Sequence, residues 1–466
     1  MKTLASRLRE KWIDRGCHVL AVITFAIGLT LSAKGAEDGN DPTRLRLIVE
    51  TDAGGDPDDE QSLIRFLLYA NEWDIEGIIA NRPRARDGEN KNPQRTGLGI
   101  VQQLVDAYGA CLPNLVQHDS RYPTIENLRE RLVPGYDETS DAVELILRAV
   151  DSDDPRPVWY SDWGTDVGGA TNNLRRALDR VLKERGPHGY AKFKQRLRLA
   201  SANPFGDHTN KILPTFPLWI DTFRPEKDRL RWYHAFSGIT AKAGGFDIER
   251  DLRTGHGPLG ALYPLNTTHP QKEGDSMTFI YLIPTGMNEP EQPTWGSWAG
   301  RYGQNETFPD RPYYWANQAD SWEGKTNRYQ SIARWAVALQ NDFAARADWC
   351  VARKYADANH PPRAFLNGDS SKRILTLHAK AGSTVKLSAA ETLDPDGDAI
   401  KTRWFVYPEP GTYRGDVELK TPAGNECEFT APIVQQRQTI HLILQVKDDG
   451  KPSLFAFRRA IITVEP

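Results

Sequence analysis

The chain has 466 residues, which is more than one ordinary hydrophobic core holds, so two or three domains are expected. Hydrophobic residues make up 39% of the chain and charged residues 26%, values that are typical of a globular protein and argue against a disordered one. The formal net charge of −3 lacks the basic excess of nucleic-acid-binding proteins, so nucleic acid is not an expected partner.

Residues 1–36 have the pattern of a signal peptide. Several lysines and arginines within the first 16 positions precede the apolar stretch "HVLAVITFAIGLTLSA" (18–33), which ends in small residues. We therefore expect cleavage between Ala33 and Ala36, and a secreted or periplasmic protein without a membrane span after cleavage. The alternative is a retained anchor, although the apolar run is short for a membrane span.

Residues 37–356 alternate between strand and helix patterns. Each buried-strand pattern is followed by apolar residues at helical spacing. The pairs are 45–50 and 59–73, 75–80 and 97–110, and 156–164 and 172–184. This alternation predicts an α/β domain with a mostly parallel sheet flanked by helices. In such sheets, ligands bind beyond the carboxyl ends of the strands.

The chain then changes character. Residues 290–325 are rich in Pro, Gly and aromatic residues and predict long loops, whereas 326–356 predict a long helical stretch. Residues 357–369 are a candidate linker. Residues 370–466 contain short alternating strand patterns separated by turn residues, which predict a small β-sandwich domain.

After removal of the signal segment, three cysteines remain: Cys111, Cys350 and Cys427. Cysteines this far apart form neither a disulfide framework nor a zinc site. One disulfide is compatible with the sequence, which does not indicate the partners. Buried free thiols are the simpler interpretation.

Four aspartates follow the first strand within eight positions, in the stretch "TDAGGDPDD" (51–59). One aspartate at a helix start is explained by N-capping and by the helix dipole. Four repel one another unless a cation or a raised pKa relieves them. On a tight glycine turn they can also converge as oxygen ligands of a hard cation such as Ca²⁺ or Mg²⁺. Both a capped helix and a metal site remain open from the spacing alone.

The same stretch resembles the nucleoside hydrolase signature D-x-D-x-G-x-D-D. Two differences are visible: Glu50 replaces the first aspartate, and two extra residues precede the pair Asp58-Asp59. Residues 45–466 as a whole resemble secreted bacterial proteins that join a nucleoside hydrolase-like domain to an Ig-like C-terminal domain, some of which are named cellulose-binding proteins. The matching stretches include "VWYSDWGTDVGGATNNLRRAL" (158–178), "GPLGALYP" (257–264), "EGDSMTFIYLIPTGMNEPEQPTWGSWAGRY" (273–302) and "RWAVALQNDFAARADW" (334–349).

The resemblance implies a calcium site. It makes Asp52 and Asp59 metal ligands and Asp58 the base that activates the attacking water. The family's later "TN" motif supplies a backbone carbonyl to the metal, which corresponds to Thr171 of "GATNN". The last ligand corresponds to Asp275 of "EGDS", for which a simple Gly-Asp turn is the alternative.

The resemblance and the sequence also suggest substrate contacts. Asp56 lies inside the insertion and Asn172 lies beside Thr171, so both are candidates. Asn203 is a polar candidate in the segment 201–223, where the acidic and amide residues of relatives are not clearly present. Trp295 and Trp298 lie in the Gly- and Pro-rich segment and could stack on a sugar, or could simply pack the loop.

The implied chemistry is hydrolysis of an N-glycosyl bond in a nucleoside-like substrate. A water activated by one carboxylate attacks through an oxocarbenium-like transition state, and the absence of a second, nucleophilic carboxylate predicts inversion. Three histidines lie in the same domain (His208, His234 and His256), but none is assigned as a general acid. The alternative function is a carbohydrate-binding protein, for instance for cellulose, that retains the hydrolase fold. A polysaccharide partner and a homo-oligomer both remain open.

Overall fold

The computed structural model describes residues 44–136, 139–165, 170–201, 215–222, 232–265, 270–305, 308–421 and 424–466. The predicted signal segment and the candidate Asn203 lie outside these ranges. Within them, none of the helices combines the length and the apolar character that a membrane crossing requires.

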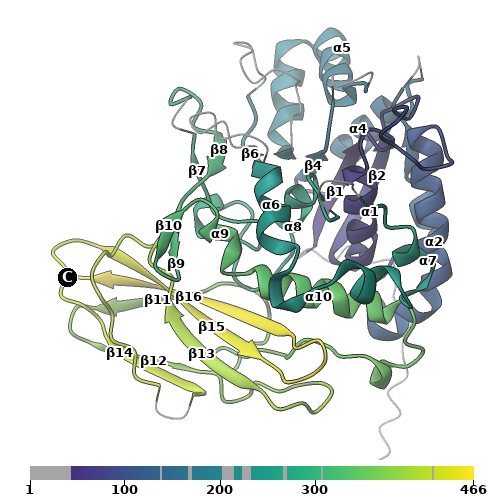
Figure 1. The fold of residues 1–466 in the computed structure, drawn as a ribbon. Coiled ribbons are helices and arrows are strands. Elements are labelled where there is room, and N and C mark those ends of the chain that lie inside the picture. Colours follow the sequence, from purple (N-terminus) through teal and green to yellow (C-terminus); the bar gives the residue numbers. More distant parts are fainter. Residues whose placement is uncertain are drawn as a thin grey trace, which may run out of the picture. The chain divides into compact units, whose positions relative to one another are not determined.

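The first part of the chain alternates between strands and helices (Figure 1). The elements in order are β1 (Leu45–Thr51), α1 (Asp58–Leu68), η1 (Ala70–Glu72), β2 (Trp73–Ala80), α2 (Gly97–His118), α3 (Ile125–Glu130), β3 (Leu132–Pro134), α4 (Asp141–Asp151), β4 (Val158–Asp162), α5 (Asn173–Gln195), β5 (Leu197–Ser201), β6 (Trp219–Asp221), α6 (Trp232–Thr240), η3 (Ala243–Gly245), η4 (Glu249–Arg253), α7 (Gly257–Ala261) and α8 (Ser276–Ile280).

The remaining elements are shorter helices and strands, followed by the C-terminal strands. They are η5 (Pro293–Trp295), β7 (Tyr302–Gln304), β8 (Tyr314–Asn317), β9 (Asp320–Trp322), β10 (Lys325–Asn327), α9 (Gln330–Ala333), α10 (Ala336–Trp349), η6 (Tyr355–Asp357), β11 (Leu375–Lys380), β12 (Thr384–Ser388), β13 (Lys401–Val406), β14 (Glu426–Thr430), β15 (Gln438–Lys447) and β16 (Phe455–Glu465).

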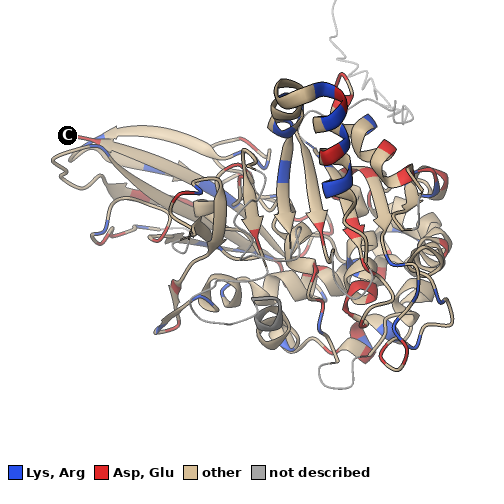
Figure 2. Ribbon diagram, turned by 90° about the horizontal axis from the view of Figure 1, so that it is seen from above, with Lys and Arg blue, Asp and Glu red and all other residues tan. Residues whose placement is uncertain are grey.

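Among the described residues, eight strands form the main sheet in the order β3-β2-β1-β4-β5-β6-β8-β7. All neighbouring pairs are parallel except β7 and β8. From β1 the chain first adds strands on one side and then, from β4 onwards, on the other. The strand order therefore reverses between β1 and β4, and a crevice for ligands is expected at their carboxyl ends. Acidic residues lie at the arrowheads of central strands in Figure 2.

The central strands are apolar because both faces of the sheet are covered. Successive side chains of a strand point to opposite faces. Accordingly, Leu47 and Val49 belong to a core shared with α1, α2, α8 and α10. Ile48, between them, belongs to the core on the other face, which α4 and α5 complete. The predicted α/β fold class, with a mostly parallel sheet flanked by helices, is confirmed.

Three stretches differ from the sequence-based expectations. The helix predicted at 59–73 ends at Leu68, and η1 and the first residue of β2 take its last positions. The predicted long loops at 290–325 contain β7 and β8, which extend the main sheet, and the β9–β10 hairpin. Strands of three or four residues are too short to show a periodic pattern, so the sequence does not indicate them. The predicted helical stretch at 326–356 divides into α9 and α10, with η6 after them.

Residues 375–465, called here the C-terminal β region, form a four-stranded sheet and a two-stranded sheet. The order in the first is β11-β16-β15-β13, and the second pairs β12 with β14. Buried residues from both sheets share one core, as the strand patterns predict. Ala364 and Leu366, inside the candidate linker, are buried in this core.

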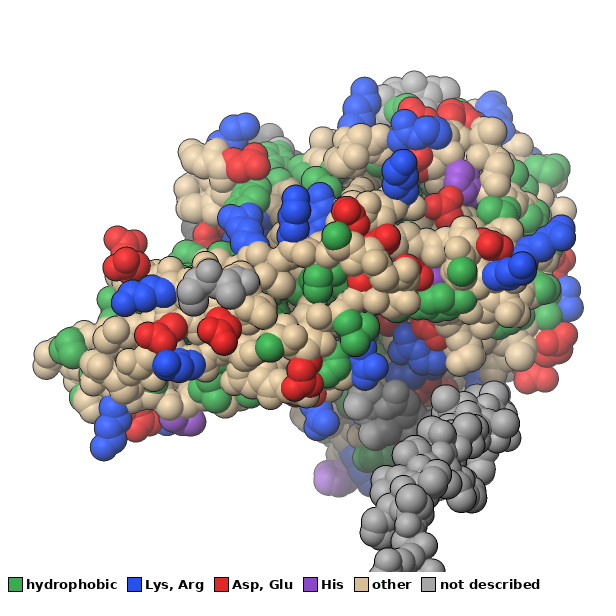
Figure 3. All heavy atoms as spheres, turned by 90° about the horizontal axis from the view of Figure 1, so that it is seen from below, with side chains coloured by type: hydrophobic (Ala, Val, Ile, Leu, Met, Phe, Trp, Pro, Cys, Tyr) green, Lys and Arg blue, Asp and Glu red, His purple; other side chains and the backbone are tan. Residues whose placement is uncertain are grey.

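The C-terminal β region also packs against the α/β part of the chain. Tyr407, Ile443 and Phe457 belong to the same buried cluster as Trp335, whose ring lies 5.6 Å from that of Phe457. The hydroxyl of Tyr407 donates a 2.6 Å hydrogen bond to the buried carboxylate of Asp320. A continuous apolar core thus joins the two parts. Figure 3 shows basic and acidic side chains interspersed over one face, as expected for a small net charge.

Candidate functional site

An acidic cluster lies at the carboxyl end of β1, where the strand order reverses. We define it as Asp52, Asp58, Asp59 and Asp275. Asp52 directly follows β1, Asp58 and Asp59 begin α1, and Asp275 precedes α8. Carboxylate oxygens of Asp58, Asp59 and Asp275 lie within 4.8 Å of one another, and all four residues are buried. Residues far apart in the sequence therefore converge on one point.

Helix capping does not account for this convergence. The residue that precedes α1 is Pro57, whose side chain makes no capping hydrogen bond. Asp56 accepts a hydrogen bond of 3.3 Å from the backbone N–H of Asp58, which is its contribution to the helix start. Within the described part of the chain, no backbone amide of α1 donates a hydrogen bond to the three carboxylates that meet in the cluster.

The carboxylate of Asp52 lies between the guanidinium group of Arg82 and the backbone at Gly164. Arg82, just after β2, donates from Nη2 to Oδ2 of Asp52 over 2.6 Å and from Nε to its backbone oxygen over 3.1 Å. On the other side, a Cβ atom at Gly164 would lie 2.7 Å from Oδ1. Gly164 therefore allows the loop after β4 to approach Asp52.

Burial and mutual repulsion raise the pKa of two cluster members. Asp59 accepts a 2.5 Å hydrogen bond from Thr51, but burial together with the charges of Asp52 and Asp275 holds its pKa well above the ordinary value. Burial and the charge of Asp52 likewise raise the pKa of Asp275. Oδ2 of Asp275 is buried and has no hydrogen-bond partner among the described residues. An unsatisfied carboxylate oxygen in a crowded acidic cluster is a favourable place for a cation.

Lys272 lies beside the cluster. Its ammonium group forms an ion pair with Asp56 and lies 3.1 Å from Oδ2 of Asp58. Neither Lys272 nor Arg82 was anticipated from the sequence. The positions of both are recognisable afterwards, because Arg82 follows the end of β2 closely and Lys272 lies three residues before Asp275.

Glu50, which replaces the first signature aspartate, is surrounded by hydrogen-bond donors from neighbouring elements. It is fully buried and accepts hydrogen bonds from the amides of Asn81 and Asn173, from the backbone N–H of Asn173, and from the hydroxyl of Tyr160. Burial raises its pKa, which these donors partly oppose. Glu50 therefore connects β1 to β4 and to the start of α5.

The loop before α5 contains the candidates Thr171 and Asn172. The backbone N–H of Thr171 donates to the carbonyl of Asn81 over 3.1 Å, which places this loop beside the end of β2. The carbonyl of Thr171 accepts a long, 3.4 Å hydrogen bond from Asn173. The side-chain oxygen of Asn172 caps α5 by accepting from the N–H of Arg175 over 2.9 Å.

The two candidate tryptophans pack within the protein. Trp298 is 5% exposed and belongs to the main hydrophobic core. The ring of Trp295 meets that of His441 edge-on at 5.6 Å, and its carbonyl accepts a 2.6 Å hydrogen bond from Arg459. These are contacts of loop packing, the alternative that the sequence left open; Trp298 is buried, whereas Trp295 is half-buried and stays a candidate for stacking.

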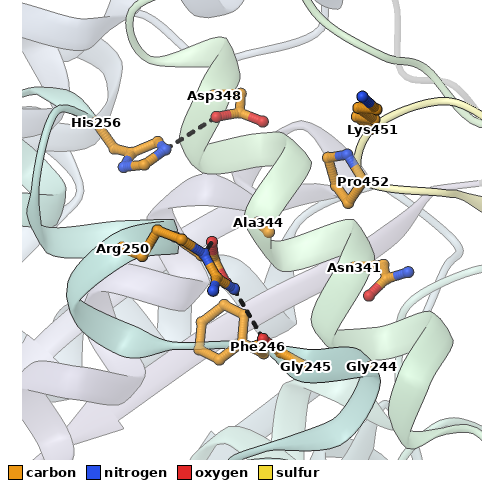
Figure 4. Close-up of a pocket in the computed structure, with 11 residues that line it drawn as sticks. Gly244, Gly245, Phe246, Arg250, His256, Asn341, Ala344, Asp348, Lys451 and Pro452 are labelled. Carbon is orange, nitrogen blue, oxygen red and sulfur yellow. Dashed lines mark hydrogen bonds and ion pairs between the residues drawn. The ribbon is translucent and has the colours of Figure 1, made fainter.

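Of the three histidines considered, only the side chain of His256 is described. Its Nε2 lies 2.9 Å from Oδ1 of Asp348, and the two line a cavity of about 300 Å³ together with Lys451 and Pro452 (Figure 4). The described residues that line this cavity include no member of the acidic cluster. His256 is therefore not a candidate for proton transfer at the cluster.

Comparisons with known proteins agree with this arrangement. Residues 46–302, which contain the whole acidic cluster, match the family model described as "Cellulose-binding Sde182, nucleoside hydrolase-like domain". The chain belongs to this family. Residues 384–464 match a second model, "Cellulose-binding protein Sde0182, C-terminal domain". The resemblance inferred from the sequence is thereby confirmed.

A solved structure supports the Sde182 assignment over most of the chain. It is a nucleoside hydrolase-related hypothetical protein from Saccharophagus degradans that is associated with carbohydrate metabolism, with 30% identity and a TM-score of 0.69. The match covers 91% of this chain and 100% of that one. A structure of protocadherin gamma B7 extracellular cadherin domains matches 20% of the chain at 17% identity and a TM-score of 0.13, which is too weak to carry an argument. No curated protein matches the chain.

Proposed function

We propose that this Sde182-family protein is a calcium-dependent hydrolase of N-glycosyl bonds with a nucleoside-like substrate. The observation that supports the proposal most is the convergence of Asp58, Asp59 and Asp275 at the carboxyl end of β1. That position is where open α/β sheets bind ligands. A nucleoside hydrolase-like fold around the cluster agrees with the proposed reaction class.

The residues of the cluster fit a hard cation. They offer carboxylate oxygens, which Ca²⁺ prefers, and one of these, Oδ2 of Asp275, is buried without a hydrogen-bond partner in the described part of the chain. We assign Asp52, Asp59 and Asp275, with the carbonyl of Thr171, as the residues that would hold Ca²⁺. When bound, the ion would orient two neighbouring sugar hydroxyls and polarise a water molecule.

Asp58 is the proposed base. Its carboxylate lies at the cluster, and the ammonium group of Lys272 holds it in place from 3.1 Å. It would accept a proton from the attacking water as the N-glycosyl bond breaks. Because a single carboxylate activates water and none attacks the sugar, the product has inverted configuration. Asp56, which pairs with Lys272 beside the cluster, and Asn172 remain proposed substrate contacts.

Calcium titration of the wild-type protein and of Asp59→Ala tests the metal site. We expect calorimetric binding by the wild type and at least a tenfold weaker binding by the variant, because a charged ligand is lost. Asp106→Asn is a matched control, since Asp106 is exposed and pairs with Arg129 on the surface. Absence of calcium binding by the wild type would overturn the metal assignment.

Release of free ribose from inosine or uridine tests the reaction. We expect release by the wild type with calcium and a loss of at least a hundredfold in Asp58→Asn, the range for removal of a general base. Asp58→Asn keeps the shape of the side chain, so unchanged calcium binding would separate a chemical role from a structural one. Equal rates for the wild type and the variant would exclude Asp58 as the base.

A second candidate function is carbohydrate binding by a protein that retains the hydrolase fold. Both family models that match the chain are named for cellulose-binding proteins, which favours a polysaccharide partner and export from the cell. We infer a secreted or periplasmic protein on the same grounds. A cellulose pull-down with the wild type and Asp58→Asn distinguishes the two functions: binding that is equal in both, without ribose release by either, supports this candidate alone.

A further inference from the structure

The structure brings together two cysteines that are far apart in the sequence. Cys111 lies in α2, and Cys350 directly follows α10. Both are buried, with 0% and 3% of their surface exposed, and the pairing of their thiols lowers the pKa of Cys111 and raises that of Cys350. The remaining described cysteine, Cys427, is buried separately in the core of the C-terminal β region.

Gly257 shows how closely the two side chains approach. A Cβ atom at Gly257 would lie 3.2 Å from Sγ of Cys111 and 3.5 Å from Cβ of Cys350. Both cysteines thus lie against the same point of the chain, together with the side chain of Val351, which a Cβ atom there would meet at 3.5 Å. The φ angle of +82° at Gly257 is one that side-chain-bearing residues rarely adopt, so the glycine preserves this close packing.

Other contacts hold the two helices in this register. Asn114, one turn after Cys111, donates a 2.8 Å hydrogen bond to the carbonyl of Cys350. The ring of His118 stacks on Trp349 with centroids 5.4 Å apart. The pair of His256 and Asp348, drawn in Figure 4, fixes the residue before Gly257 against α10. The approach of the thiols is therefore set by packed elements rather than by one side chain.

We propose that Cys111 and Cys350 form a disulfide bond when the protein folds in an oxidising compartment. The co-reactant is a disulfide of that compartment, either a small one such as oxidised glutathione or one in a protein oxidase. The thiolate of one cysteine attacks this disulfide, and the second cysteine displaces the oxidant's remaining thiol. One S–S bond breaks and one forms, and the two hydrogens of the cysteines end on the two thiols of the reduced oxidant.

In the folded protein the two thiols differ in their tendency to ionise. Pairing with Cys350 and the backbone N–H of Leu259 lower the pKa of Cys111. The same pairing and burial raise the pKa of Cys350. Both sulfurs are inaccessible in the folded protein, so the exchange takes place before α2 and α10 complete their packing. The inference does not depend on the proposed hydrolase activity, because it concerns a different part of the fold, but it rests on the export proposed above.

Mass spectrometry of the full chain, folded in a glutathione redox buffer, tests the proposal. After denaturation and alkylation, we expect a peptide that joins Cys111 to Cys350, while Cys427 is alkylated and serves as the internal control. The joined peptide should disappear on reduction. Alkylation of Cys111 and Cys350 in the oxidised sample, or a bond from either to another cysteine, would overturn the proposal.

Thermal unfolding provides a second measurement. A cross-link that closes so long a loop should raise the melting temperature by about 4 °C over that of the reduced protein. Cys111→Ser and Cys350→Ser should each abolish the difference between oxidised and reduced samples, whereas Cys427→Ser should preserve it. A redox-independent melting temperature in the wild type would contradict the proposed bond. If a serine variant fails to fold, the peptide map of the wild type still shows whether Cys111 and Cys350 are joined.

Discussion

In the folded protein, the carboxyl groups of Asp275 and Asp59 are harder to ionise than in the unfolded chain. Because their folded-state pKa values lie above the ordinary 3.8, protonation favours folding. Their contribution to stability is complete below pH 3.8 and is lost as the pH rises through the raised values. Without calcium, the cluster therefore destabilises the fold increasingly towards neutral pH.

Asp275→Asn should remove part of this pH dependence. In EDTA, we expect the variant to gain stability relative to the wild type between pH 4.5 and pH 8, by on the order of 1 kcal/mol, because one pKa unit corresponds to about 1.4 kcal/mol. Urea unfolding at both pH values measures the difference. With excess calcium the wild type should be the more stable of the two proteins, since only the wild type keeps all the proposed calcium ligands. A stability difference in EDTA that does not vary with pH would contradict this account.

Lys272 should oppose calcium at the cluster, because its ammonium group already pairs with Asp56 and Asp58. Lys272→Gln removes this cation, and we expect calcium affinity to rise by about tenfold, equivalent to about 1.4 kcal/mol. Calorimetric titration measures the change, and Lys386→Gln, at an exposed pair with Glu428, is the control. Weaker binding in Lys272→Gln would instead mean that the lysine positions the carboxylates.

The sequence was informative about single residues where charge is concentrated. The aspartates of 51–59 stood out because one helix needs only one cap. Asp275 was found through the family resemblance, since a Gly-Asp pair alone indicates only a turn. Arg82 and Lys272 could not be predicted, because a lone basic residue after a strand is common and the contact forms only in three dimensions.

At the scale of the elements, the loop after β4 forms one wall of the cluster. A Cβ atom at Gly164 would lie 2.7 Å from Oδ1 and 3.0 Å from Cγ of Asp52, whose other oxygen is held by Arg82. Gly164→Ala must therefore displace either the loop or Asp52. We expect a loss of about 1–3 kcal/mol in unfolding free energy and at least tenfold weaker calcium binding.

The control for this prediction is Gly238→Ala in α6. An added Cβ atom there meets no heavy atom within 4 Å, and alanine favours a helix over glycine by up to about 1 kcal/mol. Chemical unfolding of both variants measures the effect. If Gly164→Ala is as neutral as Gly238→Ala, the loop is not a close wall of the site.

Most of the central elements were predictable because the pattern of a buried strand followed by an amphipathic helix is strong. The strand predicted at 45–50 ends one residue before β1 does, and the helix predicted at 59–73 begins one residue after α1 does. The predicted end of that helix was wrong, because α1 ends at Leu68 and Trp73 already begins β2. The edge strands β7 and β8 were not predicted, since three or four residues carry too little periodicity. Their place beside β6 depends on long-range pairing.

At the scale of the whole molecule, the core is continuous between the α/β part and the C-terminal β region. Phe457 and Tyr407 of the latter pack on Trp335 of the former. We therefore expect one calorimetric unfolding transition for the whole chain, because each part buries some of its apolar surface against the other. Two well-separated transitions would show that the parts are independent.

Phe457→Ala tests the same junction. Loss of a fully packed phenylalanine should cost about 3–5 kcal/mol while the single transition is retained. Ile433→Ala is the control in the same β region, since Ile433 is 75% exposed and its loss should change stability by less than about 0.5 kcal/mol. Equal melting temperatures of the two variants would contradict a shared core.

The resident cations Arg82 and Lys272 have a consequence for how such a protein would mature. Because they offset part of the repulsion among the aspartates, the site can assemble before any ion arrives. On the proposed function, a newly made chain would reach its final shape in calcium-poor surroundings and acquire its ion only afterwards. Folding and activation would then be separate events, and only activation would depend on the calcium concentration around the protein.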